Sequence, residues 1–324
     1  MSGVRRAGWM LAGLAVLVSL AGTRAYAQAA DYPNRKITFL VGFAPGGGID
    51  TFARVIAQAL NEQLGYQIIV ENRAGAASNV AAKLVAESVP DGYTLLFTGN
   101  SYAINQTFYK NPGYATDDLA PVAFVALDSQ AFAVNADSPA RTLKDFLAAA
   151  QTKPFTFGFG GTSARIAAEY LFHVLAKTNG QGVPFQSGAP ALSALLGRHV
   201  DINVGPVAET HPMVSQGALR ALAVTGPRRA DALPDVPTLE ELGFKGIAIN
   251  GFIAMLAPAR TPVEIRVKLN AAVNRVIAMP SVEQRLRTLG YEPYRGTLAD
   301  APAYLKTQIG TWGDLIRATG IATE

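Results

Sequence analysis

Three glycines in a row interrupt a strand-to-helix transition near the start of this chain, and they are the residues best suited to bind an anion. An apolar run over residues 37–43 predicts a buried strand. The run breaks at Pro45 and Gly46–Gly48, and apolar residues then recur at helical spacing from 52 to 64. Glycines at this position leave backbone N–H groups bare at the positive end of the helix dipole, which suits a carboxylate or a phosphate.

The loop does not match the common nucleotide-binding motifs. A P-loop needs Lys and then Ser or Thr after its last glycine, where this chain has Ile49 and Asp50. A dinucleotide fingerprint needs a third glycine where Thr51 stands, although Glu71 follows about twenty residues later, as that motif requires. A Rossmann interpretation is weakened and stays open, as does a tight turn without ligand. We favour an anion site because three glycines exceed what a turn needs.

The same arrangement of strand end, small residues and helix start recurs twice. Gly160–Ser163 follows a predicted strand over 155–159, and Ser187–Pro190 follows one over 183–185. Each turn alone is ordinary strand-to-helix geometry. Ligands of α/β sheets bind at the carboxyl ends of strands, so the three turns could converge on one cleft.

Strands and helices alternate along the chain, which favours an α/β fold with parallel sheets covered on both faces. Strands are predicted over 37–43, 67–70, 93–98, 122–127, 131–134, 155–159, 183–185, 200–204, 220–224 and 247–256. Helices are predicted from about 50 to 64 and from 189, and over 76–88, 142–151, 162–175, 262–279, 282–289 and 298–318.

The first residues predict export. Arg5 and Arg6 precede an apolar stretch over 10–21, which is followed by Ala25–Ala27 with the sequence AYA. This pattern is typical of a secretory signal peptide over residues 1–27, and the stretch is too short to span a membrane comfortably. The chain contains no cysteine, so it is neither a lipoprotein nor disulfide-bonded. We therefore expect a periplasmic protein.

Composition and spacing argue against several functions. Loss of the signal peptide removes three of the 28 basic residues and none of the 24 acidic ones, and no basic run carries interleaved aromatics, so nucleic acid is not expected as a partner. The histidines His173, His199 and His211 lack metal-ligand spacing, and Ser163 suits a helix cap better than a nucleophile. We expect no metal, cofactor or catalytic residue. A binding protein is favoured, and an exported α/β hydrolase that uses the glycine turns as oxyanion donors remains the alternative.

Several segments, taken in order, resemble the Bug-type receptors, the periplasmic solute-binding components of tripartite tricarboxylate transporters. The matching segments are Tyr32-Pro33, 42–50 (GFAPGGGID), 70–75 (VENRAG), 90–96 (PDGYTLL), 183–191 (VPFQSGAPA), 219–225 (LRALAVT), 233–243 (LPDVPTLEELG), Ala257-Pro258 and Thr261-Pro262. Each is short, but together they cover nearly all of the chain after residue 27.

The resemblance implies an α/β, two-lobed fold like a type II periplasmic binding protein. Each lobe would hold a mixed, mostly parallel sheet flanked by helices, and two crossing strands would form the hinge. Lobe one would comprise residues 28–128 and 251–324 and would anchor the ligand. Lobe two would comprise 129–250 and would set specificity. The implied partners are a small di- or tricarboxylate or aromatic acid and either membrane transporter subunits or a sensor kinase, for a protein expected to be a monomer.

The resemblance also implies which residues contact the ligand. In lobe one they are Phe43, Ala44, Gly47, Gly48, Asp50, Thr98, Asn100 and Ser101. In lobe two they are Gly161, Thr162, Ser163, Arg165, Gln186 and Ser187. Lobe two departs from the family pattern, since the family commonly has His near Arg165 and Tyr-Lys-Gly at 185–187.

Arg165 has two possible roles. A cation in the first turn of a helix opposes the dipole, so something should offset that cost. Arg165 could pair with Glu169 four residues on, or it could grip a second carboxylate of the ligand in a bidentate manner. Both hypotheses stay open at the level of sequence.

Overall fold

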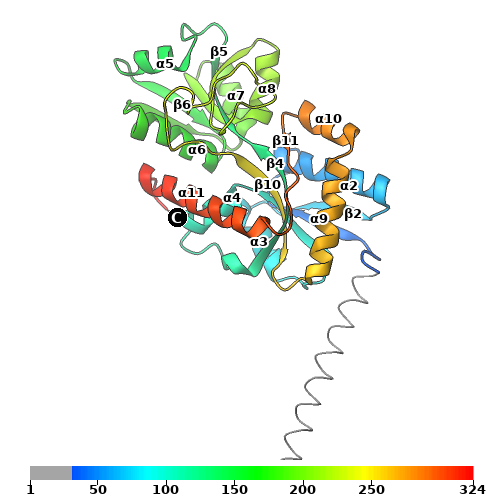
Figure 1. The fold of residues 1–324 in the computed structure, drawn as a ribbon. Helices are drawn as coiled ribbons and strands as arrows, with labels where there is room; N and C mark the ends of the chain where they lie inside the picture. The colour runs from blue at the N-terminus through cyan, green and yellow to red at the C-terminus, as the bar shows by residue number, and fades with distance from the viewer. Residues whose placement is uncertain (1–30, 324) are drawn as a thin grey trace, which may run out of the picture.

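The computed structural model describes residues 31–323, and the predicted signal peptide lies outside that range. Figure 1 shows two bodies of sheet and helix, one drawn mainly in blue, cyan and orange and the other mainly in green, with strands passing between them.

The first body contains a six-stranded sheet with the order β11-β4-β10-β3-β1-β2. Its strands are β1 (Ile37–Val41), β2 (Ile68–Asn72), β3 (Thr94–Gly99), β4 (Leu119–Asp128), β10 (Gly251–Pro258) and β11 (Glu292–Pro293). β1 pairs in parallel with β2 and β3 because a helix carries the chain back each time. β10 pairs antiparallel with β3 and β4.

Alternation along β1 explains how helices cover this sheet, because successive side chains of a strand point to opposite faces. Phe39 packs with the helices of one face and Leu40 with those of the other. The first face carries α2 (Gly48–Leu64), α9 (Val263–Ile277) and α10 (Pro280–Thr288). The second carries α3 (Asn79–Ala86), α4 (Ser101–Phe108) and α11 (Ala301–Thr319).

The second body contains a five-stranded sheet with the order β7-β6-β8-β5-β9. Its strands are β5 (Gln130–Asn135), β6 (Phe155–Phe159), β7 (Gly180–Pro184), β8 (Ile202–Pro206) and β9 (Leu219–Val224). One face packs on α5 (Leu143–Ala150), α6 (Thr162–Glu169) and the π-helical turn η3 (Tyr170–Leu175). The other packs on α7 (Gly188–Leu196) and α8 (Val207–Ser215).

The chain passes between the sheets twice. β4 leads through Ser129 directly into β5, and the segment after β9 returns into β10 at Gly251. The outgoing and returning strands run in opposite directions, so β4 and β10 pair antiparallel over their whole length. Both sheets are mixed, as expected. Each described sheet has two parallel strand pairs and at least as many antiparallel ones, so parallel pairs do not form the majority. The lobe boundaries at 128/129 and 250/251 stay a prediction.

The last helix contacts both bodies. α11 packs against α4 and β4 on one side and against α6 and η3 on the other (Figure 1). Its Trp312 is 1% exposed and belongs to an apolar cluster that also contains Leu40 of the first sheet and Phe157 of the second. α11, which the sequence assigns to lobe one, therefore also packs on lobe two.

Several elements differ from expectation. α4 and α8 were not predicted, and α8 contains Pro212, which disfavours a helical prediction. The strand predicted from 247 begins at Gly251, since the Ile249 N–H bonds to Thr225 O at 2.9 Å instead of entering the first sheet. The helix predicted over 162–175 changes to a π-helical turn at Tyr170.

Candidate functional site

The glycine loop forms an uncapped helix N-terminus at the carboxyl end of β1. Gly47 is the N-cap of α2 and is extended, and no side chain caps it. The first intrahelical hydrogen bond runs from Thr51 N to Gly47 O at 2.9 Å, so the N–H groups of the first helical residues precede it. Ala44–Gly47 is exposed, and Gly46 has a φ of +82°, where glycine is favoured. The loop presents backbone donors to an approaching anion.

The carboxylate of Asp50 binds this loop through hydrogen bonds. It is 2% exposed, and its carboxylate accepts from Gly46 N at 2.8 Å, Arg54 Nε at 2.9 Å and Asn72 Nδ2 at 2.9 Å. Burial favours the protonated form, but these hydrogen bonds outweigh it and hold the pKa of Asp50 below its ordinary value. Asp50 therefore orders the loop, a role that the spacing alone does not indicate, and its predicted contact with ligand stays a prediction.

The second predicted loop of lobe one lies at the end of the neighbouring strand β3. Thr98 is 0% exposed, and its hydroxyl lies 3.3 Å from Ser78 Oγ and 3.5 Å from Ser101 Oγ. Asn100 is the N-cap of α4 and accepts a hydrogen bond from Phe252 N at 2.5 Å. Thr98 thus links β3 to the segment at Ser78, and Asn100 links the start of α4 to β10, while Ser101 lies half-buried at the start of α4.

A segment with left-handed backbone conformation lies beside this loop, and no sequence pattern predicted it. Ala76, Ala77 and Ser78 have φ values of 45°, 50° and 81°, an uncommon conformation for residues with a Cβ. Asn105 Nδ2 secures it by donating to Ala77 O at 2.9 Å. A β-carbon at Gly42 would lie 1.9 Å from Ser78 Oγ, so Gly42 permits this approach. Such outliers concentrate at functional sites.

In lobe two, Gly161 is the N-cap of α6 with no capping side chain. Thr162 and Ser163 begin the helix itself and are half-buried, so the expectation that Ser163 caps the helix is wrong. Arg165 Nε lies 3.9 Å from Glu169 Oε1 and the Arg165 side chain is 38% exposed. Arg165 therefore has the anticipated intrahelical partner, at a distance that leaves guanidinium donors for a further acceptor.

Gln186 and Ser187 lie exposed at the carboxyl end of β7, with Ser187 as the N-cap of α7. A β-carbon at Gly160 would lie 2.1 Å from the carbonyl carbon of Ser187. Gly160 is thus required for the turns after β6 and β7 to pack together, which the sequence could only suggest.

The predicted turns of the two lobes face the same gap. Glu209, in the first turn of α8, lies close to one turn from each lobe. Its Oε1 lies 3.9 Å from the position of a β-carbon added at Gly48, and its Oε2 lies 1.5 Å from one added at Gly188. The hydroxyl of Tyr291 lies 2.6 Å from the Gly48 position, and its ring packs edge-on against Phe52. Neither Glu209 nor Tyr291 was predicted as a site residue.

The gap contains buried acids. Burial raises the pKa of Asp128 to about 8, and the neighbouring carboxylate of Glu209 adds to the rise. Burial also raises the pKa of Glu209. The pKa of Tyr291 is raised by burial and by both carboxylates. The wall formed by these side chains therefore consists of buried carboxyl and hydroxyl groups that burial favours in the protonated form, whereas the glycine loop presents backbone N–H donors.

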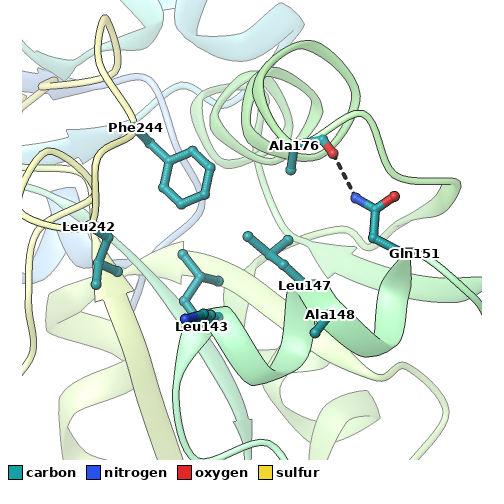
Figure 2. Close-up of a pocket in the computed structure, with 8 residues that line it drawn as sticks. Leu143, Leu147, Ala148, Gln151, Ala176, Leu242 and Phe244 are labelled. Carbon is teal, nitrogen blue, oxygen red and sulfur yellow. Dashed lines mark hydrogen bonds between the residues drawn. The ribbon is translucent and has the colours of Figure 1, made fainter.

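A hollow of about 430 Å³ lies elsewhere, between α5, the end of η3 and the segment 242–244 (Figure 2). It is lined by Leu143, Lys144, Leu147, Ala148, Gln151, Ala176, Leu242 and Phe244. Its lining is mostly apolar, and Gln151 Nε2 is engaged with Ala176 O at 3.0 Å. It contains none of the predicted ligand contacts.

Residues 31–323 contain no group of three or more His, Asp or Glu side chains that could hold a metal ion. Within the same residues, no helix has the length and apolar character needed to cross a membrane.

Two α/β bodies joined by crossing strands, with helix N-termini from both bodies at one gap, define the class of two-lobed solute-binding proteins. The chain belongs to the family described as the tripartite tricarboxylate transporter family receptor, whose profile matches residues 52–321. The family resemblance seen in the sequence is confirmed. Receptors of this family are periplasmic and are binding proteins, so the hydrolase alternative is not supported.

Individual relatives agree with this assignment. BugT of Bordetella pertussis is 30% identical over 318 residues, which are 96% of this chain and 97% of BugT. An R. palustris protein solved with adipate is 29% identical, with a TM-score of 0.82 over 90% of this chain and 99% of its own. MatC from Rhodopseudomonas palustris, solved with malate, is 29% identical, with a TM-score of 0.77 over 88% of this chain and 100% of its own.

We predict that Asp128→Asn stabilises the protein at high pH. A folded-state pKa of about 8, above the ordinary 3.8, means that the folded protein keeps a proton which the unfolded chain releases. The contribution of Asp128 to the free energy of unfolding is then fully present below about pH 4 and is lost as the pH rises toward 8. Urea unfolding at pH 5 and pH 8 should show an Asp128→Asn advantage that is larger at pH 8, with the exposed swap Asp314→Asn as control. An equal advantage at both pH values would contradict the buried-proton account.

Proposed function

We propose that this protein is an extracytoplasmic receptor that captures a small organic carboxylate between its lobes and delivers it to a tripartite-tricarboxylate-type transporter. The observation that carries the proposal is the uncapped N-terminus of α2. Asp50, the acid that could have capped it, accepts instead from Gly46 N behind the loop, which leaves the forward N–H groups to an external anion.

The anion is proposed to be a carboxylate because two structurally similar proteins were solved with adipate and malate. The ligand would lie between Phe43–Gly48 in lobe one and the turns Gly161–Ser163 and Gln186–Ser187 in lobe two. Ser101 would reach it from the start of α4. Backbone donors suit this task because their geometry is fixed by the helix and they bring no counter-charge that must be desolvated.

The remaining assignments follow from the family. Its receptors work with transporter components in the periplasm, so we propose membrane transporter subunits as the partner, with a sensor kinase as the alternative. Cleavage after Ala27 would release the mature protein, which we propose to be a monomer. N-terminal sequencing of the exported protein and light scattering test these two points.

A thermal-shift screen of organic acids tests the function directly. A ligand at a hundred times its dissociation constant should add about 2.7 kcal/mol to the free energy of unfolding. Mass spectrometry should then recover the bound acid unchanged. Turnover of the acid, or no stabilisation by any carboxylate, would contradict the receptor proposal.

We predict that Gly48→Val weakens carboxylate binding at least about tenfold. A β-carbon at Gly48 would lie 2.6 Å from the hydroxyl of Tyr291 and would block the donors of the loop. Loss of one charge-assisted hydrogen bond costs about 1.5–3 kcal/mol, or roughly ten- to hundredfold in affinity. Gly310→Val, at an exposed position of α11 where nothing lies within 4 Å of an added β-carbon, is the control. Full affinity in a cooperatively folding Gly48→Val protein would place the anchor elsewhere.

We predict that Arg165 binds a second carboxylate of the ligand. Its contact with Glu169 is long and the side chain is part-exposed, so the guanidinium can turn to a ligand at little cost. Calorimetry on Arg165→Ala should show about tenfold or greater weakening for adipate and less than twofold for hexanoate. Arg141→Ala, an exposed arginine in lobe two, is the control. Equal losses for both acids, or none, would leave Arg165 as a partner of Glu169 only.

A further inference from the structure

The start of α8, which belongs to lobe two, meets lobe one at the turn that leads into β11 (Figure 1). A β-carbon at Gly290 would lie 2.6 Å from Ala208 Cα, so this glycine admits the backbone of α8. Tyr291 follows it and packs in the core of lobe one, with its hydroxyl 2.6 Å from the β-carbon position of Gly48. Residues 290–291 thus cover the start of α8, and separation of the lobes would uncover it.

Two carboxyl groups lie at this contact, one from each lobe. Asp128 ends β4 in lobe one, and Glu209 stands in the first turn of α8, each close enough to Tyr291 to raise the pKa of its hydroxyl. Asp128 Oδ1 and Glu209 Oε2 are buried without a hydrogen-bond partner in residues 31–323, and neither acid forms an ion pair there. Ionising both acids would bury two like charges without a counter-ion, which is costly.

Few of the groups that face Asp128 could offset its negative charge. The backbone N–H groups of residues 207–208, at the start of α8, donate to it and favour the ionised form. From β11, Glu292 adds a like charge, and its Oε2 accepts from Arg228 Nη2 at 2.7 Å. Arg228 also donates through Nη1 to Asp231 at 2.7 Å. This arginine is therefore balanced by two carboxylates of its own.

The starts of two further helices face Glu209. Its Oε1 lies 3.9 Å from the β-carbon position of Gly48 in α2, and its Oε2 lies 1.5 Å from that of Gly188 in α7. Positive helix ends favour an ionised acid, but no N–H group of either helix is bonded to Oε2. Burial prevails, and it raises the pKa of Glu209. A ligand carboxylate held at the start of α2 would add a further negative charge and favour protonation more strongly.

We propose that Asp128 and Glu209 hold a proton between them when the lobes close, so that capture of a carboxylate takes up a proton and weakens as the pH rises. The inference rests on the proposed function and adds a proton to what the closed receptor binds. In separated lobes water reaches both acids, and they ionise. In closed lobes they lose that water, lie near each other's charge, and Glu209 also faces the charge of the ligand.

The direction and the pH range of the effect follow from Asp128. Its pKa is about 8 with the lobes together, against the ordinary 3.8 of an acid in water. Open lobes therefore release the proton above about pH 4, whereas closed lobes keep it up to about pH 8. Affinity should fall by up to about tenfold per pH unit across this range and level off above it, because one proton is taken up with each ligand.

Calorimetry with adipate and with malate tests the proton. Both acids are ionised at pH 6.5 and at pH 8.5, and amine buffers avoid a competing anion. Wild-type protein should bind about tenfold or more tightly at pH 6.5 than at pH 8.5. At pH 7.5, heats measured in Tris and in triethanolamine, whose ionisation enthalpies differ, should show uptake of about half to one proton per ligand.

Asp128→Asn should reduce the ratio of the two affinities to less than about threefold, because an amide has no proton to exchange in this range. Glu209→Gln should at least about halve the ratio, since Asp128 then loses its like-charged neighbour. Both substitutions keep the size of the side chain. Asp314→Asn, exposed on α11, is the matched control and should leave the ratio as in wild-type protein.

Affinities of wild-type protein that agree within about twofold at the two pH values would overturn the inference and leave the proposed function intact. Proton release on binding would overturn it too, as would a wild-type ratio in both Asp128→Asn and Glu209→Gln. If neither acid binds, small-angle scattering of the ligand-free protein decides, because protonation alone favours closed lobes. The radius of gyration should be smaller at pH 5.5 than at pH 8.5 in wild-type protein but not in Asp128→Asn, and an equal radius in wild-type protein would refute the proposal.

Discussion

The antiparallel pairing of β4 and β10 is the constraint on which the rest of this structure depends. It commits the chain to leave the first sheet and return beside its own exit, so both crossings lie next to each other. Helices that follow the parallel strands of each sheet then begin at the edge nearest the crossings, because a helix starts where its strand ends. The gap between the lobes is thereby lined by helix N-termini, and its affinity for anions is a consequence of topology before any side chain is chosen.

Glycines allow the turns of this topology to pack closely. Gly42 admits Ser78, Gly160 admits the backbone of the turn after β7, and Gly188 admits the carboxylate of Glu209, each at a distance that a Cβ would forbid. Asp50 and Asn105 then fix loops that have little side chain of their own. The glycine loop is therefore ordered by a hydrogen bond that uses only one of its own N–H groups, that of Gly46, and the N–H groups at the start of α2 stay available.

The sequence predicted the structure best where the residues of one functional feature follow one another along the chain. The strand, the glycine loop and α2 follow one another, so the anion loop could be predicted from residues 37–64 alone, and ordered family motifs supplied the two-lobed fold. α8 could not be predicted, because Pro212 disrupts its pattern and its function depends on contacts with Gly48 and Gly188, which are remote in sequence. The structural roles of Asp50, Thr98 and Asn100 were equally inaccessible, since the direction in which a polar side chain points is a property of the folded state. One local signal could have predicted the start of this helix. Pro206 ends β8, and an acid, Glu209, follows three residues later in the first turn of α8.

The two walls of the gap differ chemically, and this difference bears on how a ligand is oriented. Lobe one offers backbone donors from the start of α2, and the wall near the hinge offers the carboxyl groups of Asp128 and Glu209, which burial favours in the protonated form. A simple dicarboxylate has two similar ends, so the difference between the two walls does not favour one of its orientations over the other. A ligand with one acid group and one neutral hydrogen-bonding group can satisfy both walls in only one orientation, and closure of the lobes on the reversed ligand would bury its carboxylate against the acids instead of against the N–H groups. Asymmetry of this kind selects by penalising the wrong orientation, so specificity would arise from the acidic wall as well as from the glycine loop.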